Sequence, residues 1–134
     1  MAKISFDGMP EIEKILLKEQ ERVQRNGEAA LMAGAKVAQE ALMAAVPVSQ
    51  RSDHNGHHLR ESIIIGEIKK STMEGMSVEV GPDGYRPDGE PYAKVGFILE
   101  YGTSKHRAQP WMRPSMKKAT KAIQDAMIEE LMKD

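Results

Sequence analysis

Apolar residues recur every three or four positions over a long stretch near the start of the chain. Residues 10–45 form one such helical stripe, which would be ~50 Å long if unbroken. From residue 29 on the stripe consists mostly of Ala, Gly and Met, and small side chains permit close approach by another element. Asn26-Gly27 is the natural place for a bend or break, because glycine costs ~1 kcal/mol relative to alanine within a helix. Pro47 then stops the helix.

Alternating apolar and polar residues predict strands elsewhere. Ile4 and Phe6 are expected in a short strand that ends at Gly8. Residues 63–68 and 76–80, with a Gly-containing turn between them, predict a β-hairpin.

The stretch 92–101 allows two interpretations. Val95, Phe97, Leu99 and Tyr101 alternate with other residues, which favours a strand. Phe97 also fits one helical turn together with Ala93 and Glu100. Of the two, the strand is preferred.

Helical spacing returns at the C-terminus. Pro114 fits the first turn of a helix, because its fixed φ suits that position and its missing N–H would have no partner there. This helix is expected to run to about Lys133. One face of it is apolar: Met116, Ala119, Ile123, Met127 and Leu131. Loops rich in polar residues, Gly or Pro are expected at 48–58, 81–91 and 102–110.

Together these elements predict an α+β fold, in which a small antiparallel sheet packs against a long N-terminal helix and a C-terminal helix. The length of 134 residues is typical of a single domain covering residues 1–134. With 40% hydrophobic and 29% charged residues, the composition is that of a folded protein.

Composition excludes several classes of function. The formal net charge of -1 gives no overall field for nucleic acid or an anionic membrane. The absence of cysteine excludes disulfides, thiolate metal sites and cysteine nucleophiles. Neither a secretory signal nor an apolar stretch of roughly 18 residues is present, so synthesis in a cytoplasm without export and no membrane association are expected.

Metal-ligand candidates fall in two loops. Four residues of the first loop suit zinc or nickel: Asp53, His54, His57 and His58. No second ligand cluster accompanies them, so a solvated loop is favoured. Calcium binding by Asp83, Asp88 and Glu90 lacks the twelve-residue, helix-flanked pattern.

Signatures of catalysis are missing. The serines and histidines have no Gly-x-Ser-x-Gly elbow, and Glu129-Glu130 fits a solvated helix face. Gly81, Gly84 and Gly89 lack the spacing and the lysine of a phosphate-binding loop, and they fit Pro-Asp-Gly turns instead. Neither enzymatic activity nor a cofactor is expected.

Basic residues concentrate between the last loop and the final helix: Lys105, His106, Arg107, Arg113, Lys117, Lys118 and Lys121. A solvated face is the ordinary explanation. Positive charge in the first turns of a helix opposes its dipole, however, which points to an anionic partner, either an acidic protein surface or DNA. A small nucleic-acid-binding module is therefore the alternative function.

Trp111 is the only tryptophan and lies between Pro110 and Pro114. Such a rigid aromatic side chain either fills a core or anchors a subunit interface. The core position is favoured.

The run of residues 99–114, LEYGTSKHRAQPWMRP, resembles the signature E-[aromatic]-G-T-S…A-Q-P-[aromatic]-[aliphatic]-R-P of the phage tail-completion family, the head-tail joining proteins of long-tailed phages. The order of the remaining elements is similar to that family over nearly the whole chain, with matching pieces at 44–48, 59–63 and 92–93. Two loops depart from it. The loop of residues 49–58 is longer and richer in histidine than the usual short turn of the family. The loop of residues 81–91 contains an additional proline-rich stretch.

The resemblance implies a virion neck subunit without catalysis, made in the host cytoplasm and acting as several copies in a ring. Its expected partners are other neck and tail proteins, namely the tail terminator and head-completion proteins. Direct DNA contact is not expected, and the isolated subunit can be monomeric. The motif residues implied are Glu100, Gly102, Thr103, Gln109, Pro110, Trp111, Arg113 and Pro114.

A physical role follows for most of these positions. Glu100 and Thr103 can fix the turn, and Gly102 supplies a permissive backbone. Pro110 and Pro114 can aim Trp111 and the last helix. A pair between Arg113 and Glu100, within or between subunits, is a hypothesis.

Overall fold

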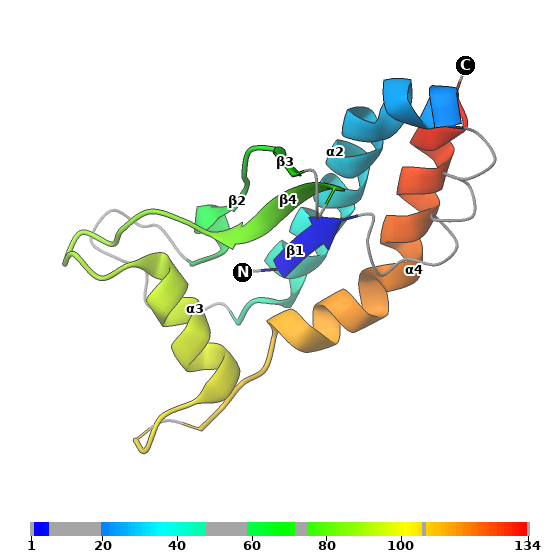
Figure 1. Ribbon diagram of the computed structural model, residues 1–134. Coiled ribbons are helices and arrows are strands. Elements are labelled where there is room, and N and C mark those ends of the chain that lie inside the picture. Colours follow the sequence, from blue (N-terminus) through cyan, green and yellow to red (C-terminus); the bar gives the residue numbers. More distant parts are fainter. Residues whose placement is uncertain (1, 6–19, 48–58, 72–74, 106, 134) are drawn as a thin grey trace.

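The computed structural model describes residues 2–5, 20–47, 59–71, 75–105 and 107–133. The elements of these residues follow one another as β1 (Ala2–Ser5), α2 (Gln20–Ala45), the 3₁₀ turn η1 (Leu59–Ser62), β2 (Ile63–Ile65), β3 (Lys69–Ser71), β4 (Gly75–Pro82), α3 (Tyr92–Tyr101) and α4 (Met112–Leu131) (Figure 1). Helix α2 packs against both α4 and the sheet. The predicted α+β fold is confirmed.

Helices α2 and α4 approach each other closely along the small-residue half of α2. A Cβ atom added to Gly34 would lie 2.7 Å from Cγ of Met127 and 3.3 Å from Cγ2 of Ile123. Leu31 and Leu42 are fully buried on the same helix. The close approach predicted from the Ala, Gly and Met content is therefore confirmed.

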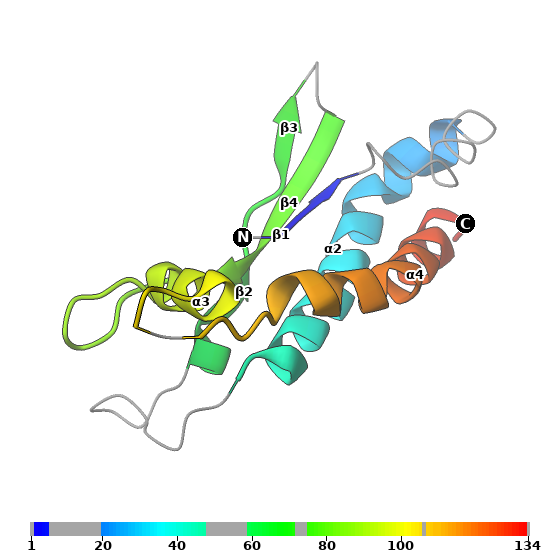
Figure 2. The ribbon, with the colours of Figure 1, turned by 90° about the horizontal axis from the view of Figure 1, so that it is seen from below.

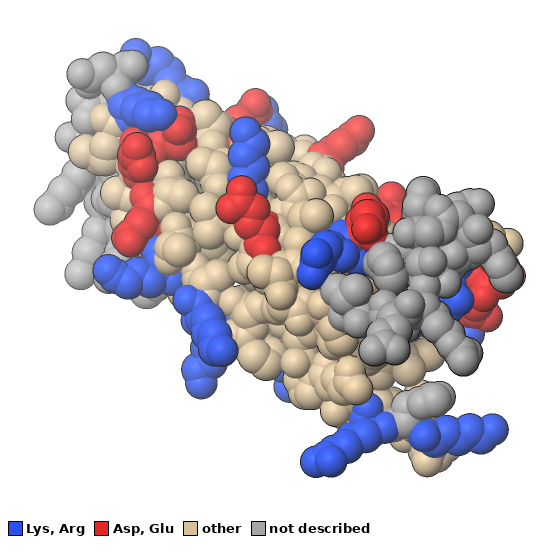
Figure 3. Space-filling model, turned by 180° about the vertical axis from the view of Figure 1, so that it is seen from behind, with Lys and Arg blue, Asp and Glu red and all other residues tan. Residues whose placement is uncertain are grey.

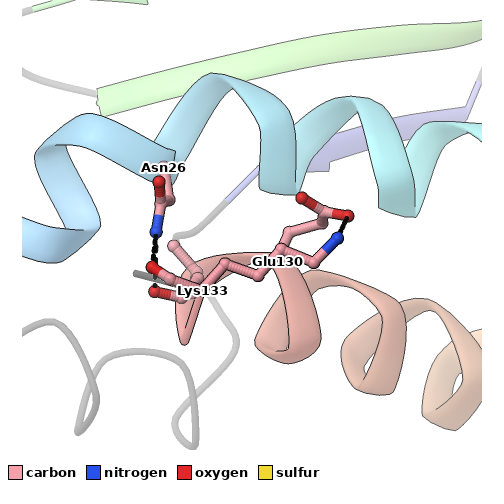
Figure 4. Close-up of polar contacts among 4 residues, drawn as sticks. Asn26, Glu130 and Lys133 are labelled. Carbon is pink, nitrogen blue, oxygen red and sulfur yellow. Dashed lines mark hydrogen bonds and ion pairs between the residues drawn. The ribbon is translucent and has the colours of Figure 1, made fainter.

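Of the bend or break predicted at Asn26-Gly27, the break is wrong, because α2 continues through both residues. The bend stays a prediction. The Asn26 side chain does not compete with its own helix. Its Nδ2 donates hydrogen bonds to the carbonyl oxygens of Leu131 at 3.2 Å and Lys133 at 2.5 Å, at the end of α4 (Figure 4). The last carbonyls of a helix lack partners within it, and Leu131 is the last residue of α4, so Asn26 ties the two helices together. The first ten residues of the expected helix lie outside the described residues.

Strand β4 forms the centre of the sheet. It pairs antiparallel with β1, from Ala2 opposite Val80 to Ser5 opposite Ser77, and it also pairs with β2 and β3. The Gly66 N–H donates to the Glu79 carbonyl at 2.8 Å between β2 and β3. The predicted first strand and hairpin are thus confirmed within the described residues.

Strand β4 is longer than predicted, because Gly81 and Pro82 belong to it and are buried. They were expected in a loop, but Ile64 and Ile63 pair opposite them. The loop proper begins at Asp83. Its two Pro-Asp-Gly turns end at glycines with φ of +84° and +91°, Gly84 and Gly89, a backbone region that favours glycine.

The strand preferred for the stretch 92–101 is wrong, because residues Tyr92–Tyr101 form helix α3. Its buried residues are Tyr92, Gly96 and Glu100, one on every fourth position. The alternation of apolar residues wrongly indicated a strand, because Phe97 and Tyr101 lie on one exposed face of a helix and not on one face of a sheet. Figures 1 and 2 both place α3 at the end of the molecule opposite the C-terminal end of α4.

Helix α4 places Pro114 in its first turn, as predicted. The expected apolar face is buried at Ala119, Ile123, Met127 and Leu131, whereas Ser115 takes the buried position beside half-buried Met116. None of the helices in the described ranges is both long enough and apolar enough to cross a membrane.

Candidate functional site

Helix α4 begins with a cap that comes from another helix. Its N-cap residue, Trp111, makes no capping hydrogen bond with its own side chain. The Glu100 carboxylate of α3 accepts hydrogen bonds from the backbone N–H of Trp111 at 2.7 Å, Met112 at 2.7 Å and Arg113 at 3.1 Å. The first N–H groups of a helix lack partners within it, and the helix dipole favours a negative charge there. Glu100 therefore fixes the start of α4 against α3.

Glu100 is buried, with 7% of its surface exposed. Burial by itself would raise the pKa of its carboxyl group. The backbone hydrogen bonds from Met112, Trp111 and Arg113, with the nearby Arg113 charge, outweigh burial and lower this pKa below its ordinary value of 4.5. The group therefore caps the helix as a carboxylate at neutral pH.

Trp111, the residue at the start of α4, packs its side chain against α3. Only 2% of its surface is exposed, and its Nε1 donates to the Gly96 carbonyl at 3.1 Å. A Cβ atom added to Gly96 would lie 3.1 Å from Cζ2 of Trp111 and 3.3 Å from Cγ of Pro82. The absence of a side chain at Gly96 thus lets the indole ring reach the α3 backbone.

The loop after α3 is held by short-range hydrogen bonds. Gly102 ends the helix with φ of +75°, and its N–H donates to the Ile98 carbonyl at 2.7 Å. Thr103 Oγ1 accepts from the Lys105 N–H at 3.2 Å. A non-glycine residue at the Gly102 position would be strained, so the sharp exit from α3 depends on this glycine.

The far side of the loop returns to α3 and then exposes two prolines. The Gln109 N–H donates to the Leu99 carbonyl at 2.7 Å. Pro110 and Pro114 are exposed and line, with the edge of Trp111, a groove of about 460 Å³. Other residues of this groove come from α2 and α4: Ala41, Ala44, Ala45, Ser115, Lys118 and Ala119. The motif therefore has a buried side, which holds the helices, and an exposed side.

Two aromatic side chains of α3 point outward beside this motif. Phe97 is 62% exposed and Tyr101 53% exposed, and their ring centroids are 4.7 Å apart. The Arg113 guanidinium carbon lies 5.7 Å from the Tyr101 ring centroid. Sequence reasoning missed this pair, although the four-residue spacing of Phe97 and Tyr101 would have shown it had the segment been assigned as a helix.

The hypothesis of a pair between Arg113 and Glu100 takes a different form in the chain. The contact is made by the backbone N–H of Arg113, while its guanidinium lies over Tyr101 and acts on Glu100 through its charge. A pair between subunits stays a prediction.

Basic residues spread over the surface around the motif. Lys105, Arg107, Lys117 and Lys118 are exposed, and Lys121 lies 3.9 Å from Asp125. Seen from behind, the residues drawn in colour along the lower edge of the molecule include basic and no acidic side chains (Figure 3). His106 lies outside the described residues.

Comparison with protein families gives a match. The model of the family described as "Bacteriophage HK97-gp10, putative tail-component" matches residues 11–102, which is more than half of the chain. The chain belongs to this family of phage tail components. No curated protein and no solved structure matches it.

The family match covers α2, the strands β2 to β4 and α3, and it ends at Gly102. Glu100 and Gly102 lie inside the matched range, whereas the motif from Thr103 to Pro114 lies beyond it. As a tail component, the protein is a structural part of the virion.

The metal-ligand candidates do not come together in the part of the chain that the structure describes. Oδ2 of Asp88 lies 3.6 Å from Nη2 of Arg86, and Oε2 of Glu90 lies 2.9 Å from Nζ of Lys94, so both carboxylates form ion pairs with basic neighbours. No group of three or more His, Asp or Glu residues placed to hold a metal ion occurs among residues 2–5, 20–47, 59–71, 75–105 and 107–133. The candidates Asp53, His54, His57 and His58 lie outside these residues.

Proposed function

We propose that this tail component is a neck subunit that completes the tail and joins it to the head connector, acting as several copies in a ring. The observation that best supports this proposal is the cap of α4 by Glu100, which accepts three backbone hydrogen bonds of 2.7 to 3.1 Å. It locks two helices at a fixed angle and leaves Phe97, Tyr101, Pro110 and Pro114 exposed. We call this junction between α3 and α4 the corner. A rigid corner with an exposed surface suits docking, because little conformational entropy is lost on binding.

The chemistry of the corner also supports a structural role. Its buried carboxylate, Glu100, is occupied by backbone N–H groups, and its indole N–H is bonded to Gly96. General acid–base catalysis needs a group that is free to exchange a proton with a substrate, and both of these nearly buried groups are already engaged in hydrogen bonds. The partners proposed are the tail terminator and head-completion proteins, docked on the exposed side of the corner.

Deletion of the coding sequence from the phage or prophage that carries it tests this role. We expect filled heads and incomplete tails that stay unjoined in electron micrographs, with infectivity restored by adding the purified protein to the lysate. The matched control is a lysate supplemented with the Glu100→Ala variant, which should restore much less. Normal yields of infectious, tailed particles from the deletion strain would refute the proposal.

The alternative is a small nucleic-acid-binding module that uses residues 105–121. The exposed Lys117 and Lys118 in the first half of α4 are the observation that favours it. DNA retention that weakens steeply with salt, and that disappears when Lys117 and Lys118 are both replaced by Gln, would support this alternative.

A further inference from the structure

Charge is segregated along the chain. Residues 92–124 contain seven of the 19 Lys and Arg residues and one of the 20 Asp and Glu residues. That one acidic residue, Glu100, is buried beneath backbone N–H groups. The exposed charge of α3, the following loop and the first half of α4 is therefore positive. Because the net charge is -1, the rest of the chain is negative by nearly the same amount.

An apolar surface lies within the positive segment. We define the basic-aromatic patch as Phe97, Tyr101 and Arg113, which line a hollow of about 430 Å³ together with Pro82, Ala93, Gly96, Glu100 and Met112. Both rings are more than half exposed, and the guanidinium stacks above one of them. Aromatic residues and arginine are enriched in the centres of protein interfaces and carry much of the binding energy there.

A second exposed apolar surface carries the opposite charge. We define the acidic patch as Glu61, Ile64, Asp83 and Tyr85, which line a hollow of about 210 Å³ that contains no Lys or Arg. Tyr85 is 73% exposed and Ile64 is 40% exposed. An exposed aromatic ring beside carboxylates is the complement of an exposed aromatic pair beside a guanidinium.

The two patches face different sides of α3. Tyr92 borders the hollow of the acidic patch, and Phe97 and Tyr101 follow it by five and nine residues in the same helix. At about 100° per residue, these two side chains point about 140° and 180° away from Tyr92. One molecule therefore presents both patches outward in different directions.

From this arrangement we infer that the basic-aromatic patch of one subunit binds the acidic patch of a second copy of the chain. The inference rests on the proposed ring-forming function and names the surfaces that would build the ring. Contact between two different patches is heterologous, so each subunit uses both, and the assembly closes into a ring or continues as a filament. Opposite charges on one nearly neutral chain favour a second copy over an unrelated acidic protein.

Mixing two variants tests the inference. One variant, Phe97→Ser with Tyr101→Ser, lacks the basic-aromatic patch, and the other, Asp83→Lys with Tyr85→Ser, lacks the acidic patch. Sedimentation velocity should show that the wild-type chain associates, that the association weakens with salt, and that each variant alone associates at least 10-fold more weakly. An equimolar mixture should form dimers and stop there, because each mixed pair retains one intact copy of each patch. Met132→Ser, which changes a residue 43% exposed outside both patches, is the matched control and should behave as the wild type.

Three outcomes overturn the inference. The first is a wild-type chain that stays monomeric up to about 1 mM, the weak end of specific binding. The second is undiminished association of either patch variant, or no dimer in their mixture. The third is salt-sensitive DNA binding that the Phe97 and Tyr101 substitutions abolish, which would assign the basic-aromatic patch to nucleic acid instead.

These outcomes are separable from a failure of the proposed function. If the patches mediate association but the deletion strain makes normal tails, the contact stands and the neck role fails. If tails require the protein but patch variants associate and restore infectivity like the wild type, the neck role stands and the contact fails.

Discussion

Helices α3 and α4 meet at the same corner but differ in which of their residues are buried. Helix α4 buries Ile123, Met127 and Leu131 against the rest of the molecule. Helix α3 buries only one large apolar residue, Tyr92, beside a glycine and a carboxylate at positions 96 and 100, and it exposes the rings of Phe97 and Tyr101. An ordinary amphipathic helix resembles α4. The burial of a carboxylate and the exposure of two aromatic rings in α3 indicate that its buried side serves to hold α4, while its exposed side is available for a partner.

The largest expected effect on stability comes from removing the Trp111 side chain, which lies at the start of α4 and contacts α3. Trp111→Ala should lower the free energy of unfolding by about 3–5 kcal/mol, because it empties a fully packed site and breaks the bond to Gly96. Urea denaturation followed by circular dichroism measures this. Trp111→Phe, which keeps an aromatic ring, is the control and should cost clearly less. Equal stability of the Ala variant and the wild type would show that the two helices are held by other contacts.

The fold was largely predictable from the sequence because most elements carry a simple period. The row Ala119, Ile123, Met127 and Leu131 identified α4, and alternation identified the hairpin. Helix α3 was not recognised, because its buried positions are Tyr92, Gly96 and Glu100 and only one of them is a large apolar residue. Periodicity of hydrophobicity does not reveal a helix that buries a glycine and a carboxylate while two of its aromatic side chains, Phe97 and Tyr101, face solvent.

The candidate site was predictable as a set of residues but not as a set of contacts. The motif suggested that Glu100 and Arg113 interact, and they do so through the backbone of Arg113. Which atom of a residue makes a contact depends on where its element begins. The start of α4 at Met112 places three N–H groups, not side chains, opposite the carboxylate.

Removing the Glu100 carboxylate should have the second-largest effect. Glu100→Ala is expected to lower stability by about 2–3 kcal/mol at pH 7, because buried N–H groups at the start of α4 lose a charged acceptor. Glu100→Gln should cost less, since one carbonyl oxygen remains. Chemical denaturation of both variants gives the comparison. A loss below about 0.5 kcal/mol in the Ala variant would contradict a capping role.

The same carboxylate predicts a pH dependence. Its pKa is lower in the folded chain than its ordinary value of 4.5, so the unfolded chain binds more protons in this range. The contribution of Glu100 to stability is therefore present above pH 4.5 and is lost as the pH falls through the folded-state pKa. The difference in unfolding free energy between wild type and Glu100→Gln should shrink over that window. A constant difference from pH 7 down to pH 3 would argue against this assignment.

A third substitution tests the packing of α4 on α2. Gly34→Val should destabilise by about 2 kcal/mol, because its side chain would meet Met127 and Ile123 where even a Cβ atom lies 2.7 Å from Met127 Cγ. Thermal unfolding is a sufficient measurement. Lys36→Val on the exposed face of the same helix is the control for the lower helix propensity of valine and should cost only a few tenths of a kcal/mol. Equal losses in the two variants would mean that the helices can separate without cost.

The smallest effect on stability is expected at the exposed rings of α3. Phe97→Ser and Tyr101→Ser should each change the unfolding free energy by no more than about 0.5 kcal/mol, since both side chains are more than half exposed. Denaturation midpoints of the single variants measure this. A loss of 2 kcal/mol or more would show that the rings belong to the core of the fold and would remove the contrast with α4.

The most direct test asks whether the exposed face of α3 is covered in the assembled particle. The chain contains no cysteine, so Tyr101→Cys introduces a unique thiol, and Glu67→Cys places one at an exposed position outside both patches. Maleimide labelling followed by mass spectrometry compares the free subunit with purified phage particles. We expect the thiol at position 101 to react in the free subunit and to be protected in particles, with the thiol at position 67 as the reference for access of the reagent. Equal reactivity at position 101 in free subunit and particle would contradict a docking role for this face.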